Sequence, residues 1–260
     1  MDEANYLAQG LFLFLLIVFT HWAGYKKNLF SLLKITYQNR LYPVWGGILT
    51  LITILCYMFS VPLIPWYAPF IVLLMYFALG HKEQFLSLLK DQKTLPKTSL
   101  LWDVLIGFTL FIVSLPLLSF VGNALEIILS YYFQMEVPRQ YIVDMISQIR
   151  DNIPLLLFIF LLICVLVPAF EEFLYRANIQ TWLKNTFSPF WAIFLTSVFF
   201  ASCHFFTIDT VAGKIIVLAS TFISSMYLGF AYERQRSLVA SITYHSLMNT
   251  LTFVQVLFIG

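Results

Sequence analysis

Charged residues are scarce in this chain, and their scarcity excludes an ordinary soluble protein. Asp, Glu, Lys and Arg make up 11% of the residues, whereas hydrophobic residues make up 60%. Soluble domains carry about 25% charged residues. The core of a 260-residue protein cannot hide so many apolar side chains. The sequence therefore predicts an all-α, polytopic membrane protein embedded in a lipid bilayer.

Cysteine is also rare, and the charge balance is almost even. Cys56, Cys164 and Cys203 lie inside apolar segments and show no metal-ligand spacing. A disulfide framework is therefore not expected. The net charge of +2 carries little information in a membrane protein, where the placement of basic residues matters more than their sum. Nucleic acid is not expected as a partner, and the oligomeric state is left open.

Apolar runs that can cross a bilayer occur eight times. A spanning helix needs about 20 mostly apolar residues. The third run is short because it begins after Pro62 and Pro65, and the fourth is expected to continue as helix to about Phe133. The expected spans cover residues 7–24, 42–60, 65–80, 100–122, 153–176, 188–206, 211–231 and 237–259.

The basic residues lie mostly on one side of this topology. Twelve of the 15 lysines and arginines lie at the connections after spans one, three, five and seven, counting Arg176, the last residue of span five. Cytoplasmic loops carry the excess of Lys and Arg, so these connections are expected in the cytoplasm and both chain ends outside. Asp2 and Glu3 precede the first apolar run, where a secretory signal carries basic residues, so we expect a retained first span.

The chain is expected to divide into two parts. Residues 1–150 would hold the first four helices and an external connector, about 136–152. Residues 151–260 would hold the last four helices. Chemistry-bearing residues concentrate in this second part. The titratable residues His21, His81 and Asp103 lie near span ends and are expected at the solvated or interfacial surface.

Two adjacent glutamates end an almost unbroken apolar run. Glu171 and Glu172 follow residues 153–170, and Arg176 comes one helical turn later. Ionisable groups in membrane-embedded sequence cost about 2.5–3.5 kcal/mol each on insertion scales, so they indicate a functional site. Glu172 and Arg176 are i,i+4 neighbours that can pair, which leaves Glu171 free to accept a proton. An ordinary charged helix end is the alternative.

Histidine and asparagine occur in two later apolar segments. His204 follows small residues that leave room for a cavity; the alternative is a buried hydrogen-bonding histidine. His245 and Asn249 share one face of the last span and can both donate to a developing oxyanion. The alternative for this pair is a polar clasp between helices, worth about 0.6 kcal/mol. If the fifth helix continues to about Lys184, the acid and both imidazoles lie at similar depth.

Three motifs in order resemble the signature of a known protease family. Glu171-Glu172-x-x-x-Arg176, Phe200-x-x-x-His204 and His245-x-x-x-Asn249 are similar to the motifs of the CPBP intramembrane protease family. The family includes the CAAX prenyl endopeptidases and bacterial proteins linked to bacteriocin immunity and peptide processing. The resemblance covers about residues 153–255, and no motif position departs from the pattern.

The resemblance implies a role for each motif residue. Glu171 would be the general base that activates water, and His204 would help to orient that water. His245 and Asn249 would stabilise the tetrahedral oxyanion, and these four residues would be catalytic. Glu172, Arg176 and Phe200 would support the geometry of the site. Peptide hydrolysis needs a proton acceptor and oxyanion donors in any case, so the residue types agree with the chemistry.

The role of a metal is a separate question. Glu171, His204 and His245 could supply a His₂Glu zinc site with one open position. No His-Glu-x-x-His sequence is present, and too few ligands remain if His245 serves the oxyanion. The sequence favours a metal-independent glutamate mechanism, with zinc as the alternative.

The leading hypothesis is an intramembrane endopeptidase acting on a peptide or membrane-protein substrate. Its active site would open to the cytoplasmic side of a bacterial plasma membrane. A non-catalytic membrane regulator that binds a kinase or an exporter is an alternative. A proton-coupled transporter is a weaker alternative, since no inverted repeat or pair of Gly/Pro-broken helices is evident. The sequence does not distinguish a lipidated substrate from an unmodified peptide.

Overall fold

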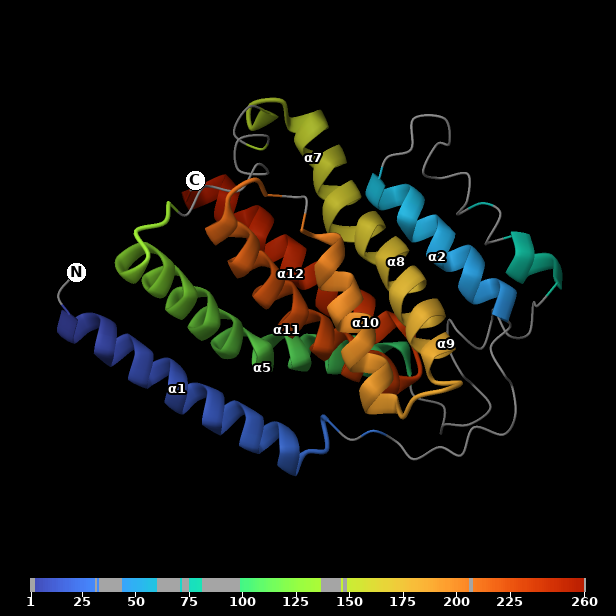
Figure 1. The fold of residues 1–260 in the computed structure, drawn as a ribbon, viewed down its shortest axis with the longest axis horizontal. Helices are drawn as coiled ribbons and strands as arrows, with labels where there is room; N and C mark the ends of the chain where they lie inside the picture. Colours follow the sequence, from blue (N-terminus) through green and yellow to red (C-terminus); the bar gives the residue numbers. More distant parts are fainter. Residues whose placement is uncertain are drawn as a thin grey trace.

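The protein is mostly helical in the part of the chain that its computed structural model describes. That part comprises residues 3–30, 32, 44–59, 71, 75–80, 99–136, 146, 149–205 and 208–259. It contains no β-strand, so the predicted all-α class is confirmed (Figure 1). The α-helices are α1 (Glu3–Lys26), α2 (Val44–Phe59), α5 (Leu100–Ile127), α7 (Ile153–Leu161), α8 (Val167–Glu172), α9 (Thr181–Leu183), α10 (Pro189–Cys203), α11 (Val211–Gln235) and α12 (Leu238–Ile259). The π-helical segments are η1 (Tyr76–Gly80), η2 (Ile128–Tyr132), η3 (Leu162–Leu166) and η4 (Phe173–Gln180).

Four helical segments in the described residues are long and apolar enough to cross a membrane. They are Ala8–Lys26, Leu100–Tyr132, Ile153–Leu183 and Val211–Gln235, and they match expected spans one, four, five and seven. The segments support an integral membrane protein.

The count of eight spans stays a prediction. Expected spans two and six form shorter apolar helices, Val44–Leu55 and Pro189–Cys203. The last expected span forms α12, and the third lies outside the described residues except near its end. Most of the expected external connector, 136–152, also lies outside them.

The segments α7, η3, α8, η4 and α9 form one uninterrupted helical rod, Ile153–Leu183 (Figure 1). Asn152 caps its start, because the Asn152 Oδ1 accepts a hydrogen bond from the Leu155 N–H at 3.2 Å. The expectation that the fifth helix continues past Arg176 is confirmed. Glu171 therefore lies well inside the helix and not at its end.

A second group of helices packs around α11. Helix α11 contacts α10 on one side and α5 and α12 on the other, while α1 lies against α5 (Figure 1). Thr210 caps the start of α11 by accepting a hydrogen bond from the Gly213 N–H at 3.2 Å. Arg236 ends it in the left-handed conformation, with φ 49°, and α12 begins two residues later. The tight turn holds α11 and α12 side by side.

Two titratable residues near expected span ends are wholly or partly buried. Asp103 is fully buried, and its Oδ1 accepts a hydrogen bond from the Gln235 Nε2 at 2.9 Å. His21 is half-buried, stacks on Phe30 and hydrogen-bonds the Tyr227 hydroxyl through its Nε2. The expected solvated position of His21 was wrong, because Phe30 and Tyr227 cover its ring, whereas the expected interfacial depth of Asp103 stays a prediction. His81 lies outside the described residues.

The contact between α5 and α12 depends on a glycine. A Cβ added to Gly107 would lie 2.4 Å from the Ala240 backbone oxygen, closer than any real contact. The Gly107→Ala variant should therefore force α5 and α12 apart and cost about 1–3 kcal/mol of unfolding free energy. Thermal unfolding of the purified protein measures the loss.

Gly122→Ala is the matched control in the same helix. A Cβ at Gly122 meets nothing within 4 Å, so alanine should raise stability by up to about 1 kcal/mol through its better helix propensity. Equal melting temperatures for the two variants would contradict the close approach of α5 and α12.

Candidate active site

The buried carboxylate of Glu172 lies at the centre of the motif residues. Glu172 and Arg176 are both fully buried, and the Arg176 Nε donates to the Glu172 Oε2 at 3.1 Å. The His245 Nδ1 lies 3.0 Å from the other oxygen, Oε1. Each oxygen of Glu172 thus has a charged or polar partner from the motif set. The predicted pairing of Glu172 with Arg176 is present.

The contact with Glu172 fixes the proton arrangement of His245. A carboxylate oxygen accepts hydrogen bonds, so the Nδ1 of His245 carries the proton and donates it to Glu172. The His245 Nε2 is thereby directed toward Glu171, whose Oε2 lies 3.6 Å away. Neutral His245 presents a lone pair at Nε2, and doubly protonated His245 presents a second N–H there.

Glu171 shares the buried region but differs from Glu172 in its surroundings. Its residue exposure is 7%, against 0% for Glu172. Its separation of 3.6 Å from the His245 Nε2 is longer than a normal hydrogen bond. The two adjacent glutamates therefore have distinct environments: Glu172 is held by Arg176 and His245, and Glu171 faces the imidazole edge from the side that is not fully enclosed.

His204 joins the group through Phe200. The ring of Phe200 lies 4.8 Å from the ring of His204 and 5.9 Å from the ring of His245, between centroids. The Arg176 guanidinium carbon lies 5.3 Å from the centre of the same phenyl ring. Phe200 is 3% exposed, so it serves as a rigid spacer that sets both imidazoles relative to the Glu172–Arg176 pair.

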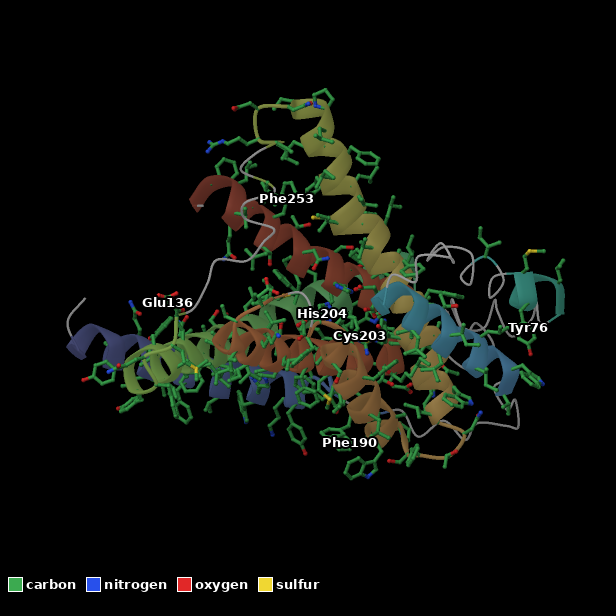
Figure 2. The ribbon with its side chains drawn as sticks, turned by 45° about the horizontal axis from the view of Figure 1, so that its top comes forward. Tyr76, Glu136, Phe190, Cys203, His204 and Phe253 are labelled. Atoms are coloured by element: carbon green, nitrogen blue, oxygen red, sulfur yellow. The ribbon has the colours of Figure 1, made fainter. Side chains whose placement is uncertain are left out.

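The orientation of the His204 ring is also set by a backbone acceptor. Its Nδ1 lies 2.9 Å from the Phe200 carbonyl oxygen, so Nδ1 carries a proton and the neutral ring presents an accepting Nε2. Figure 2 shows His204 and Cys203 near the middle of the molecule, whereas Phe190, at the other end of α10, lies at its periphery. His204 is half-buried, and the two histidines use the same nitrogen for anchoring.

Asn249 contacts the helical rod and not the glutamates. Its Nδ2 donates to the Ile163 carbonyl oxygen at 2.9 Å. Ile163 lies in η3, where i→i+5 pairing would make Pro168 the donor to this oxygen, but proline has no N–H. Asn249 therefore supplies the missing donor, and a carboxamide Nδ2 has a second N–H for another acceptor. Neighbouring side chains commonly satisfy groups freed by proline in membrane helices.

Residues at four-residue spacing extend the site along the rod beyond the motifs. Residues 172, 176, 180 and 184 recur every four positions, as do 225, 229 and 233 on α11. The Arg176 Nη2 donates to the Ser225 Oγ at 2.9 Å. The Gln180 Nε2 donates to the Gly229 carbonyl at 3.3 Å and to the Glu233 Oε1 at 3.1 Å, and Lys184 pairs with the same carboxylate.

These contacts join the rod to α11 over about two helical turns. A sequence signal for them exists, namely polar residues at four-residue spacing beyond the EExxxR motif. Ser225 and Gly229 on α11 give no such signal, because serine and glycine are common in membrane helices. Arg176 is thus an internal residue of the site, and its expected place in a cytoplasmic connection was wrong.

The described residues contain no group of three or more His, Cys, Asp or Glu side chains placed to hold a metal ion. The anchored histidines present Nε2 atoms of the kind that metals use, and the His245 Nε2 lies 3.6 Å from the Glu171 Oε2. The choice between a metal-independent mechanism and a His₂Glu zinc site stays a prediction, and no step is assigned to a metal.

Comparison with known proteins agrees with the motifs. Residues 153–251 match the family described as Type II CAAX prenyl endopeptidase Rce1-like. No curated protein and no solved structure matches the chain. The resemblance of this segment to the CPBP/CAAX protease family is therefore confirmed, and since that family consists of proteases, peptidase activity in a membrane protein is supported.

The Glu172–Arg176 pair should behave as a buried ion pair. Arg176→Met leaves the Glu172 charge without its cation, which should cost about 3–5 kcal/mol of unfolding free energy. The double variant Glu172→Gln/Arg176→Met removes both charges and should recover part of the loss. Denaturation of the purified variants gives the coupling energy. Additive losses in the double variant would contradict a direct pair.

Proposed function

We propose that the protein is an intramembrane endopeptidase that hydrolyses a peptide bond with a water activated by Glu171. The observation that carries this proposal is the distance of 3.6 Å between the Glu171 Oε2 and the His245 Nε2. Glu172 contacts the Nδ1 of the same ring. This arrangement combines a carboxylate that can take a proton with an imidazole whose orientation is fixed. The match to a prenyl endopeptidase family supports the same chemistry.

In the first step, Glu171 removes a proton from water while the hydroxide oxygen attacks the scissile carbonyl carbon. His204 orients this water, because its Nε2 accepts a hydrogen bond while Nδ1 donates to the Phe200 carbonyl. The carbonyl π electrons move to oxygen and form a tetrahedral oxyanion. Doubly protonated His245 donates from Nε2 to that oxyanion, and Asn249 provides the second donor.

In the second step, the tetrahedral intermediate collapses. The oxyanion re-forms its carbonyl, the carbon–nitrogen bond breaks, and protonated Glu171 gives its proton to the leaving amine. Glu171 thus returns to the carboxylate form. Glu172 and Arg176 take no proton in either step; they keep His245 in place, because the ionised Glu172 accepts from its Nδ1 throughout.

The substrate is proposed to be a peptide or a membrane-protein segment that reaches the site from the cytoplasmic leaflet. The excess of basic residues in the expected cytoplasmic connections supports this orientation, also without Arg176. A bacterial plasma membrane and a role in peptide processing or bacteriocin immunity are part of the same proposal, by analogy with the family. Whether the substrate is lipidated is tested by the experiment below.

The Glu171→Gln variant should abolish cleavage while the protein still folds and inserts. Glutamine keeps the size of the side chain but cannot accept the proton of water, so the rate should fall by about 10²–10⁴-fold. Comparing peptide termini in membranes carrying the intact protein and the variant measures the effect. Termini present only with the intact protein identify the substrate, the bond and any lipid on it.

Glu126→Gln is the control, because Glu126 is an exposed glutamate of α5 outside the site. Membranes that carry Glu126→Gln should contain the same peptide termini as membranes that carry the intact protein. His204→Ala and His245→Ala should reproduce the loss seen with Glu171→Gln. Unchanged processing by Glu171→Gln would eliminate the glutamate mechanism and favour a non-catalytic regulator that acts through its helices.

Metal removal should leave the activity intact under the proposed mechanism. Membranes treated with 1,10-phenanthroline and washed should cleave the identified substrate at the untreated rate, because carboxylate, imidazoles and carboxamide supply all the proposed steps. The rate before and after treatment is the measurement. Loss of cleavage that returns on adding Zn²⁺ would replace this mechanism with the zinc alternative on Glu171, His204 and His245.

A further inference from the structure

Four buried polar atoms between α10, α11 and η4 have no hydrogen-bond partner among the described residues. They are the Arg176 Nη1, the Gln180 Oε1, the Thr196 Oγ1 and the Ser197 Oγ. All four residues are fully buried. Buried polar groups are almost always hydrogen-bonded, to protein or to ordered water, and an orphaned one is costly. Four such atoms in one place therefore need a common explanation.

The positions of neighbouring side chains bring the four atoms to one region. At one end, Phe200 of α10 lies against the Arg176 guanidinium. At the other end, a Cβ built on Gly229 would lie 2.6 Å from the Ile193 side chain and 3.1 Å from the Gln180 Oε1. Helix α10 thus runs from the level of Gln180 to the level of Arg176.

Thr196 and Ser197 lie between these two levels. They follow Ile193 by three and four positions, and Phe200 follows it by seven, so all four share one face of α10. This face places Thr196 and Ser197 between the levels of Gln180 and Arg176. Neither hydroxyl is used in a bond to its own helix, unlike the hydroxyl of Thr50, which donates to the Gly46 carbonyl at 2.7 Å.

The donor and acceptor groups between Arg176 and Gln180 determine which kind of ligand can bind there. Arg176 offers an N–H donor. Gln180 offers an acceptor, and its amide orientation is fixed because its Nε2 donates to the Gly229 carbonyl and the Glu233 carboxylate. An anion would be repelled by the Gln180 Oε1, and a cation by the guanidinium. Water both accepts and donates, and hydroxyl groups can do either, so water matches the set.

We propose that Arg176, Gln180, Thr196 and Ser197 form an internal water-binding site between α10, α11 and η4. The bound water accepts from the Arg176 Nη1 and donates to the Gln180 Oε1, and the two hydroxyls complete its coordination. With Glu172 on Nε and Ser225 on Nη2, the water gives each nitrogen of the guanidinium a partner. Thr196 and Ser197 are thereby positioning residues for the Glu172–His245 contact.

The sign of a stability change tests the site without reference to catalysis. Thr196→Val keeps the shape of the side chain and removes the hydroxyl. If the hydroxyl binds water, the variant should lose about 2–4 °C in melting temperature. If the hydroxyl is buried in a dry contact, removing an unsatisfied polar group should leave the melting temperature unchanged or raise it. Either of these last results overturns the proposal.

Thr50→Val is the matched control, since Thr50 is an equally buried helical threonine whose hydroxyl is bonded within α2. Thr50→Val measures the cost of replacing a buried helical threonine by valine. The melting temperature must therefore fall further in Thr196→Val than in Thr50→Val. Thr196→Ser keeps a hydroxyl at the site and should retain more stability than Thr196→Val, with the cost of the missing methyl group read from Thr50→Ser.

An experimental structure of the whole protein that resolves ordered water gives the direct test. A water within hydrogen-bond distance of both the Arg176 Nη1 and the Gln180 Oε1 is the expected result. Direct contact between a hydroxyl of α10 and the Arg176 Nη1, with no water between them, overturns the proposal. Loss of the water in a Thr196→Val/Ser197→Ala structure would show that the hydroxyls hold it.

The catalytic consequence rests on the proposed function and is read separately. Thr196→Val should reduce kcat for the identified substrate by about tenfold with KM unchanged, because a less constrained Arg176 loosens the Glu172–His245 contact. Thr196→Ser should restore most of kcat. If Glu171→Gln is fully active, the endopeptidase mechanism fails, whereas the melting temperatures and the ordered water still decide the water site.

Discussion

The ionised carboxylate of Glu172 is the group around which the C-terminal half of the structure is arranged. A charge in the interior of a membrane protein is costly unless it is paired and hydrogen-bonded. Arg176 pairs one oxygen and His245 donates to the other, which joins the helical rod to α12. Arg176 itself contacts Ser225 of α11 and the ring of Phe200 of α10. One buried charge thus ties together the helices that carry the motifs.

The pairing also separates the roles of two chemically identical neighbours. Glu172 is enclosed and has its oxygens occupied, so it holds a geometry. Glu171 lies one residue away, about 100° around the helix, and faces the edge of the His245 ring. Glu172 keeps a proton on the Nδ1 of His245, and this sets how the Nε2 of the same ring can act. Glu172 thus influences the proposed chemistry without contacting the substrate. Under the proposed mechanism, the adjacent carboxylates divide into a support, Glu172, and a proton acceptor, Glu171.

Departures from regular α-helix geometry occur beside the site. The π-helical segments η3 and η4 flank the short helix α8, which contains both glutamates. Pro168 explains the first departure, since it cannot donate to the preceding turn, and Asn249 satisfies the carbonyl of Ile163 in its place. Such segments are frequent at functional sites. Here the contact also fixes the face of α12 that carries His245, because Asn249 and His245 are i,i+4 neighbours.

The all-α class, the continuation of the fifth helix, the pairing of Glu172 with Arg176 and the protease resemblance could all be predicted from the sequence. Each follows from local properties: apolar run length, the helical repeat and short motifs. The packing of the helices was needed to find that His245 is anchored on Glu172, that Asn249 contacts Ile163, and that Asp103 is buried against Gln235. These contacts join residues tens of positions or more apart, and the helical repeat fixes which face a side chain occupies but not which helix packs against that face.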